Sequence, residues 1–137
     1  MVLRSRMSLL NLTLSLKIIH YAKRFVDRRY YRYSLYRGLD CSSFTQAVFA
    51  KYGVELYRTS LEQSRQGMKV DKRNLRAGDL LFFYVPGRYR SRKIVGHVAI
   101  YVGRNKMIHC IPHSKIVIRD LDKPHWRKTY LFAKRII

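Results

Sequence analysis

The stretch "GLDCSSFTQAVFAKYG", residues 38–53, decides the fold. Apolar residues recur through it at helical spacing, Asp40 is a residue type that caps helices, and Gly53 suits a helix C-terminus. We therefore expect a helix over residues 41–52 with Cys41 at its first position. Unpaired backbone N–H groups and the helix dipole lower a thiol pKa there, so Cys41 is a candidate nucleophile. A buried, unreactive cysteine is the alternative.

Outward from this helix the chain divides into helices before residue 77 and strands after it. Helical spacing predicts a helix over residues 18–26, and a short helix begins at Ser60 and ends by Gly67. Downstream, five short runs are rich in β-branched and aromatic residues: "DLLFFYV", "HVAIYV", "KMIHCI", "KIVIRD" and "YLFAKRII". Helices followed by strands predict an α+β domain with a mostly antiparallel sheet.

Two of these runs form an expected hairpin, "GHVAIYVGRNKMIHC". If the three residues "GRN" make the loop, Val102 pairs with Lys106, and His97 and His109 lie as diagonal neighbours on one face. The same register sends Cys110 to the apolar face as a small hydrophobe. A two-residue loop would instead place the histidines on opposite faces. A thiol nucleophile needs a base and a group that orients the base, and this histidine pair is the candidate for both.

Charge is the most unusual property of the composition. The 137 residues hold 29 Lys and Arg against 8 Asp and Glu, a net charge of +21. This balance favours polyanionic partners: nucleic acid, anionic lipid or the anionic polymers of a bacterial envelope. A solvated surface that gives solubility is the other interpretation. Two cysteines are too few for a disulfide framework, and no Cys/His spacing indicates a metal, so we expect no cofactor.

Residues 1–17 form a leading segment, and residues 18–137 are expected to form a single domain. Arg4 and Arg6 precede an apolar run, as in a signal peptide, but polar residues interrupt the run and no small-residue cleavage site follows. The segment is also too short and too polar for a membrane span. It is therefore weakly signal-like or helical, and the route of export stays open.

Several blocks, in order, resemble the NlpC/P60 family of cysteine peptidases: "GLDCSSFTQAVFAKYGVELYRTSLEQSRQG", "LRAGDLLFFYVPG" and "GHVAIYVGRNKMIHC". The resemblance implies a papain-like fold in which the nucleophile helix packs on an antiparallel sheet, with residues 18–137 as the catalytic domain. It makes Cys41 the nucleophile, His97 the general base and then acid, and His109 the residue that orients His97. The backbone N–H of Cys41 would serve the oxyanion hole.

The resemblance also nominates residues around the nucleophile. Tyr31, in "YRY", matches a tyrosine whose hydroxyl lines the site. Asp40 and Ser42, beside the nucleophile, and Arg58 and Ser60, in "RTS", match positions that contact the peptide. A helix cap for Asp40 and a fold-holding charge for Arg58 are the structural alternatives.

The chain departs from the family pattern in two places. Ser43 stands where the family has Gly after Asp-Cys-Ser, and Ser34-Leu35 replaces a Gly-Gly pair. Both changes affect the entrance of the site and leave the three expected catalytic residues intact.

Membership of the family implies hydrolysis of bacterial murein stem peptides through an acyl-enzyme. The bond would be the one between D-γ-glutamyl and a diamino acid, or a peptide crosslink. Peptidoglycan is then the expected partner, in the periplasm, in the cell wall or outside the cell, with cytoplasmic or phage and effector delivery as alternatives. The basic charge also suits anionic envelope polymers and a membrane surface.

Two other functions stay open at this stage. The same acyl-enzyme chemistry would serve an acyltransferase or amidase. A non-catalytic polyanion binder is the third reading, because "RRYYRYSLYR" and "GRYRSRK" interleave Arg with Tyr. No nucleic-acid motif accompanies these runs, so nucleic acid is the least expected partner.

Overall fold

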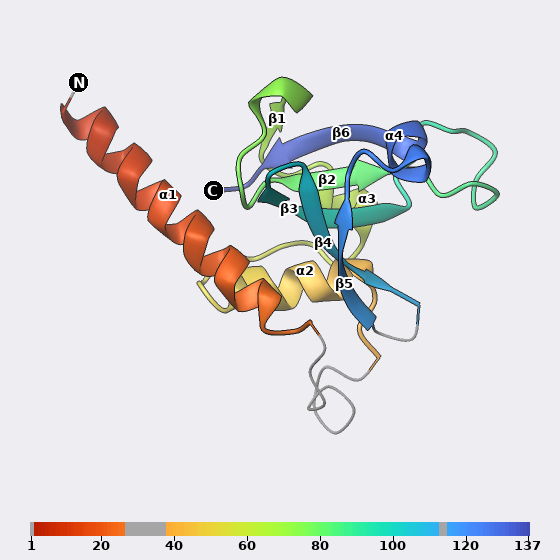
Figure 1. The fold of residues 1–137 in the computed structure, drawn as a ribbon, viewed down its shortest axis with the longest axis horizontal. Coiled ribbons are helices and arrows are strands. Elements are labelled where there is room, and N and C mark those ends of the chain that lie inside the picture. Colours follow the sequence, from red (N-terminus) through yellow and green to blue (C-terminus); the bar gives the residue numbers. More distant parts are fainter. Residues whose placement is uncertain (1, 27–37, 113–114) are drawn as a thin grey trace.

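A six-stranded antiparallel sheet forms the centre of this computed structural model, which describes residues 2–26, 38–112 and 115–137 (Figure 1). The helices are α1 (Val2–Lys23), α2 (Cys41–Ala50), α3 (Ser60–Gln63) and α4 (Pro124–Thr129), with a 3-10 turn, η2 (Lys72–Asn74). The strands are β1 (Met68–Val70), β2 (Leu80–Phe83), β3 (His97–Gly103), β4 (Lys106–Ile111), β5 (Lys115–Asp120) and β6 (Tyr130–Arg135). Their order across the sheet is β1-β6-β2-β3-β4-β5. The predicted α+β architecture is confirmed.

Both faces of the sheet are apolar, and each packs on different helices. Residues of one parity on β2, β3 and β4, among them Phe82, Val98 and Ile108, share a buried cluster with residues of α1 and α2. Residues of the other parity, among them Phe83 and Met107, belong to a second cluster that includes Trp126 of α4. Because side chains alternate along a strand, the two clusters lie on opposite faces.

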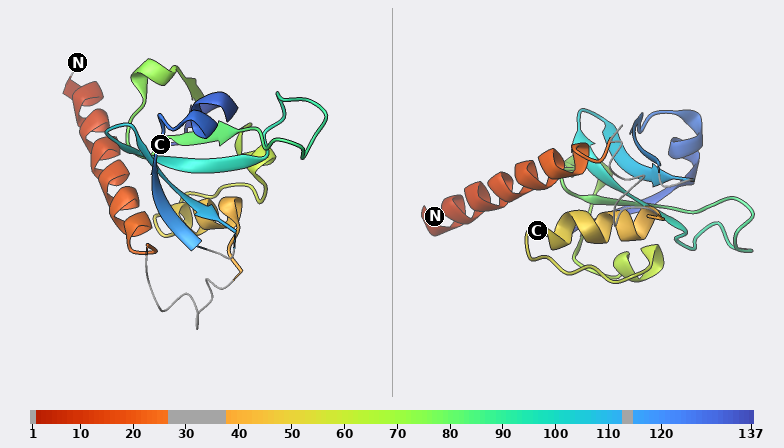
Figure 2. Two further views of the ribbon diagram at one scale, coloured as in Figure 1. Left: turned by 45° about the vertical axis from the view of Figure 1, so that its right-hand side comes forward. Right: turned by 90° about the horizontal axis from the view of Figure 1, so that it is seen from below.

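Helix α2, which begins at Cys41, is held by aromatic packing. Phe44 and Phe49 of α2 are fully buried, and the Phe44 ring meets that of Phe25 edge to face at 5.4 Å. Burial of one such ring stabilises the fold by about 2 kcal/mol. Figure 2 shows α2 lying along the sheet with its first turn at the strand ends. The position of Cys41 is therefore fixed by the core.

The hairpin between β3 and β4 corrects the expected loop. Gly103, not Val102, is the partner of Lys106, and the two-residue turn is Arg104 and Asn105, with φ of 50° and 62°. A bulge between Tyr101 and Gly103 absorbs the extra residue, so the pairs further along, such as Tyr101 with Met107, keep the predicted register. Both histidines consequently remain on one face.

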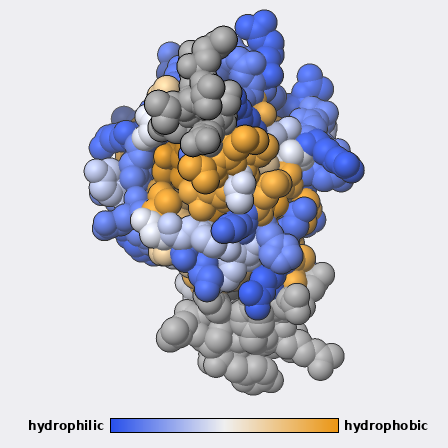
Figure 3. All heavy atoms as spheres, turned by 90° about the vertical axis from the view of Figure 1, so that its left-hand side faces the viewer, coloured by the Kyte–Doolittle hydropathy of each residue, from blue (hydrophilic) through white to orange (hydrophobic). Residues whose placement is uncertain are grey.

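The first helix is longer than the sequence pattern predicted. It begins at Val2 and joins the leading segment to the helical region expected from residue 18. One face of its last turns is buried through Ile18, Ile19 and Ala22. Nearer the N-terminus, Leu9, Leu10, Leu12 and Leu16 are exposed, each by more than half. Figure 3, viewed from the side on which α1 lies, shows an apolar area ringed by hydrophilic surface. None of the described helices combines the length and the hydropathy that crossing a membrane requires.

The sequence missed three short elements, β1, η2 and α4. Each has six residues or fewer, too few for a hydrophobic period to show.

Candidate active site

Cys41 is the first residue of α2, and a complete capping box holds that end of the helix. The Asp40 carboxylate accepts a hydrogen bond from the Ser43 backbone N–H at 2.7 Å, and the Ser43 hydroxyl oxygen accepts one from the Asp40 N–H at 2.8 Å. Ser43, which departs from the family's glycine, therefore supplies half of the cap. The cap prediction for Asp40 is confirmed.

The two strand histidines are joined directly. Nε2 of His97, the first residue of β3, lies 2.8 Å from Nδ1 of His109 on β4. His97 is half-buried, and His109 is fully buried in the middle of its strand. Because Nε2 of His97 is taken by His109, Nδ1 is the ring nitrogen left for a reacting group.

A cavity of about 340 Å³ brings the cysteine and the first histidine together. Its described lining includes Cys41, His97 and Cys110, and the charged side chains among the described lining residues are Asp40 and Arg88. The histidines belong to the sheet face opposite α2. The cavity borders both sides because the first residue of β3, His97, and the first residue of α2, Cys41, both line it. Cys110, 4% exposed and packed in the α2-side core, is the small buried residue that alternation predicted, although it also borders the cavity.

Burial keeps the Cys41 thiol and the imidazoles of His97 and His109 neutral. It raises the pKa of the Cys41 thiol, and the backbone amides of Val98 and Ser42 offset only part of that effect. Burial lowers the pKa of His97 to about 4 and that of His109 to about 3, with neighbouring positive groups adding to both shifts. At neutral pH the resting site therefore holds a thiol and two neutral imidazoles.

The neutral pair has a defined arrangement of protons if His97 is to act as a base through Nδ1. His97 must then donate its Nε2–H to Nδ1 of His109, and His109 must carry its own proton on Nε2. That Nε2 is buried and has no hydrogen-bond partner among the described residues. A protonated His109 would bury a charge with nothing to pair it, which agrees with its low pKa.

Trp126 of α4 packs against both histidines. This tryptophan was not among the residues predicted from the sequence. Its ring stacks on His97 at 5.6 Å and 27°, and it meets His109 edge to face at 5.0 Å and 89°. The sequence signals that could have drawn attention to Trp126 are that it is the one tryptophan of the chain and that it directly follows His125.

A polar network lies beside Cys41. Arg58 donates to the Asp40 carboxylate at 2.8 Å and to the Ser42 hydroxyl at 2.9 Å. Burial alone would raise the pKa of Asp40, but the hydrogen bonds from Arg58 and Ser43 hold it well below its usual range. The network therefore keeps a carboxylate at the head of α2 and gives that carboxylate a partner.

Three further predicted residues, Ser42, Arg58 and Ser60, are not among the described residues that line the cavity. Ser60 is buried at the start of α3 and does not line the cavity as far as the structure describes the lining. Its neighbour Gln63, which the sequence analysis also missed, links α3 to α2 through hydrogen bonds to Thr45 Oγ1 at 2.7 Å and the Ser42 carbonyl at 3.0 Å. Tyr31 lies outside the described residues. Over residues 2–26, 38–112 and 115–137, no three His, Cys, Asp or Glu side chains are grouped to hold a metal ion.

Cys41 at the head of a helix and a histidine pair on neighbouring strands of an antiparallel sheet define an α+β protein with a candidate cysteine–histidine site. Residues 28–135 match the NlpC/P60 family. The chain belongs to the NlpC/P60 family.

Relatives of known name agree with this assignment. The chain is 37% identical over 102 residues to the murein DD-endopeptidase MepS/murein LD-carboxypeptidase of Escherichia coli, covering 74% of this chain and 51% of the relative. It is 38% identical over 101 residues to the gamma-D-glutamyl-L-lysine dipeptidyl-peptidase of Bacillus cereus, covering 73% of this chain and 29% of the relative. The chain thus spans about half or less of the length of these relatives.

The fold has solved counterparts. The crystal structure of an NlpC/P60 family protein from Bacillus cereus superposes with a TM-score of 0.73 at 31% identity, covering 89% of this chain and 40% of that protein.

Proposed function

We propose that the protein is a cysteine peptidase that hydrolyses peptidoglycan stem peptides, with Cys41 as nucleophile, His97 as base and His109 as orienting residue. One observation carries the proposal: the 2.8 Å contact between His97 Nε2 and His109 Nδ1, behind a cavity that Cys41 lines from the first turn of α2. The names of the relatives, a murein endopeptidase and a glutamyl-lysine peptidase, support the substrate class.

The reaction begins with transfer of the Cys41 thiol proton to Nδ1 of His97 as the sulfur attacks the amide carbonyl. The positive charge on His97 is stabilised because its Nε2–H donates to His109. His97 then gives its proton to the leaving amine, and a thioester to Cys41 remains. Water, deprotonated by His97, hydrolyses the thioester and restores the thiol.

The negative oxygen of the tetrahedral intermediate needs donors at the head of α2. The backbone N–H of Cys41 is one of the unpaired amides of the first helical turn, so we assign it to the oxyanion hole. Asp40 and Arg58 hold this turn in place. We assign Ser42 and Ser60 to holding the first turn of α2 in place. Groups that face the cavity are assigned to contact with the substrate.

The charge of +21 suits a substrate carried on an anionic sacculus. Binding to sacculi and other anionic envelope polymers should weaken as salt rises, because exposed charges are screened over about 8–10 Å at physiological ionic strength. An envelope location follows from this substrate. Sedimentation with purified sacculi at rising salt tests this part, and salt-independent binding would contradict it.

Digestion of purified peptidoglycan tests the activity. The wild type and Cys41→Ala are each incubated with sacculi whose stem peptides contain diaminopimelate and with sacculi whose stem peptides contain lysine. The released fragments are identified by mass spectrometry. Stem-peptide fragments from the wild type alone are expected, and their masses identify the bond. Equal release by the two proteins, or no release by the reduced wild type from either wall type, would contradict the proposal.

A further inference from the structure

Among the described residues that line the active-site cavity, one positive side chain has no matching negative one. Of the two charged residues in this described lining, Asp40 is already paired with Arg58 at 2.8 Å. Arg88, the other, forms no ion pair with any described residue. One guanidinium nitrogen, Nη1, donates to the Gly96 carbonyl at 2.9 Å. Nη2 and Nε make no hydrogen bond to a described residue.

The structure fixes where this cation lies. Gly96 directly precedes His97, so the bond from Arg88 to Gly96 places the guanidinium beside the proposed base. The contact is close: a Cβ on Gly96 would meet Val85 Cγ2 at 3.0 Å and Arg88 Cδ at 3.4 Å. A glycine at this position therefore lets the arginine side chain lie along the start of β3. Its charge is felt by both Cys41 and His97.

We propose that Arg88 binds a carboxylate of the substrate next to the scissile bond and so makes the site selective for stem peptides in which this carboxylate is free. The inference rests on the proposed function. A glutamyl residue linked through its γ-carbonyl has an α-carboxylate that is not part of that amide bond. Three carbons separate this carboxylate from the carbonyl that Cys41 would attack. The diamino acid on the other side of the bond can carry a second carboxylate.

The chemistry of arginine fits this role. A guanidinium presents donors in a planar fork that matches a carboxylate, and charge-assisted hydrogen bonds are stronger than neutral ones. One arm of the Arg88 fork is held by Gly96, which reduces the side-chain freedom lost on binding. Converting the carboxylate to an amide would remove the charge and place N–H donors against N–H donors.

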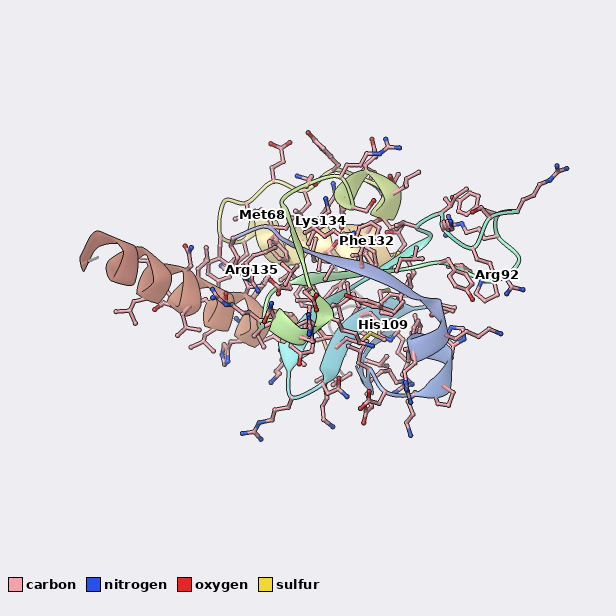
Figure 4. The ribbon with its side chains drawn as sticks, turned by 90° about the horizontal axis from the view of Figure 1, so that it is seen from above. Met68, Arg92, His109, Phe132, Lys134 and Arg135 are labelled. Atoms are coloured by element: carbon pink, nitrogen blue, oxygen red, sulfur yellow. The ribbon has the colours of Figure 1, made fainter. Side chains whose placement is uncertain are left out.

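Arg92 provides a matched control on the same loop. Like Arg88 it is exposed and lies between β2 and β3, but it is not among the described residues that line the cavity containing Cys41. Figure 4 shows it on the projecting loop, well apart from His109. Arg88→Gln and Arg92→Gln change the net charge equally, so only the position differs.

The experiment measures peptide binding by calorimetry to Cys41→Ala protein, which cannot turn the peptide over. The probes are L-Ala-γ-D-Glu-diaminopimelate, the peptide with the glutamyl α-carboxylate amidated, and the peptide with lysine replacing diaminopimelate. For the Cys41→Ala protein, and for the same protein with Arg92→Gln added, one of the two altered peptides should bind about tenfold more weakly than the unaltered peptide. With Arg88→Gln added to Cys41→Ala, the unaltered peptide should bind about as weakly as that altered peptide. The altered peptide that binds more weakly to Cys41→Ala identifies the carboxylate that Arg88 contacts.

Two outcomes would overturn the inference: no discrimination among the three peptides, including no binding of any, or full discrimination in the Arg88→Gln background. Turnover by the wild type is measured separately on the same peptides. Discrimination in binding without turnover would contradict the proposed peptidase and leave the carboxylate site standing, so the two failures are distinguishable.

Discussion

Acid titration of Trp126 fluorescence should report protonation of the histidine pair directly. Trp126 is the one tryptophan of the chain and stacks on His97 at 5.6 Å. An imidazolium in contact with an indole quenches its emission, whereas a neutral imidazole does so weakly. The His97 pKa is lowered from 6.5 to about 4. At 1.36 kcal/mol per unit, this corresponds to about 3 kcal/mol in favour of the neutral ring.

The assay follows emission from pH 7.5 to pH 3, with far-ultraviolet circular dichroism to confirm that the protein stays folded. His125 also touches Trp126, at 4.6 Å, so the titration is run on His125→Gln. We expect quenching with a midpoint near pH 4 and its loss in His125→Gln/His97→Gln. A midpoint near pH 6.5 that disappears with His97 would show that the pair is not held neutral and would refute the electrostatic account.

The same pKa has a consequence for stability, with a fixed sign. The unfolded chain takes up a proton on this histidine below pH 6.5, whereas the folded chain does not until about pH 4. Stability from His97 is therefore complete above pH 6.5 and falls as the pH drops toward 4, by up to about 3 kcal/mol. Urea unfolding of the wild type and His97→Gln at pH 7 and pH 4.5 measures this difference, and a smaller pH dependence in the wild type would contradict it.

Substitutions at four positions test other parts of the site. His109→Ala should lower kcat/KM about 100-fold and His109→Asn less, because an amide oxygen can still accept from His97; equal losses would argue against an orienting role. Asp40→Ala should cost about 1–2 kcal/mol of unfolding free energy because it removes a helix cap as well as an ion pair, while Arg58→Ala should cost under about 1 kcal/mol because both partners are half exposed. The reverse order in urea unfolding would refute this assignment. Ser43→Gly should lower the Tm by about 3–5 °C through loss of the capping box, and an unchanged Tm would show that the cap is dispensable.

The helix that begins at Cys41 was predictable from the sequence because its cap, its apolar spacing and its terminal glycine all agree. Alternation along "GHVAIYVGRNKMIHC" also placed His97 and His109 on one face, although the turn itself was wrong. A bulge adds one residue to one strand, and no residue type in the loop specifies it. The register was recovered because the apolar faces of both strands must coincide.

Other parts of the site could not be read from the chain. Trp126 lies on a six-residue helix without a hydrophobic period, and only the tertiary fold brings that helix over the histidines. Arg88 was one basic residue among several in its loop, and the contact with Gly96 that distinguishes it is invisible in sequence. The low pKa values depend on burial, which residue type alone does not determine.

Mapping of the acyl-enzyme tests the central claim most directly. The protein is mixed with a stem peptide that carries a good leaving group at the scissile bond, quenched in acid, and analysed by intact and tandem mass spectrometry. The account predicts one acyl group, lost slowly by hydrolysis, on Cys41 and none on Cys110, the chain's other cysteine. Cleavage without an adduct on Cys41 under rapid quenching, or an adduct on Cys110 instead, would contradict it.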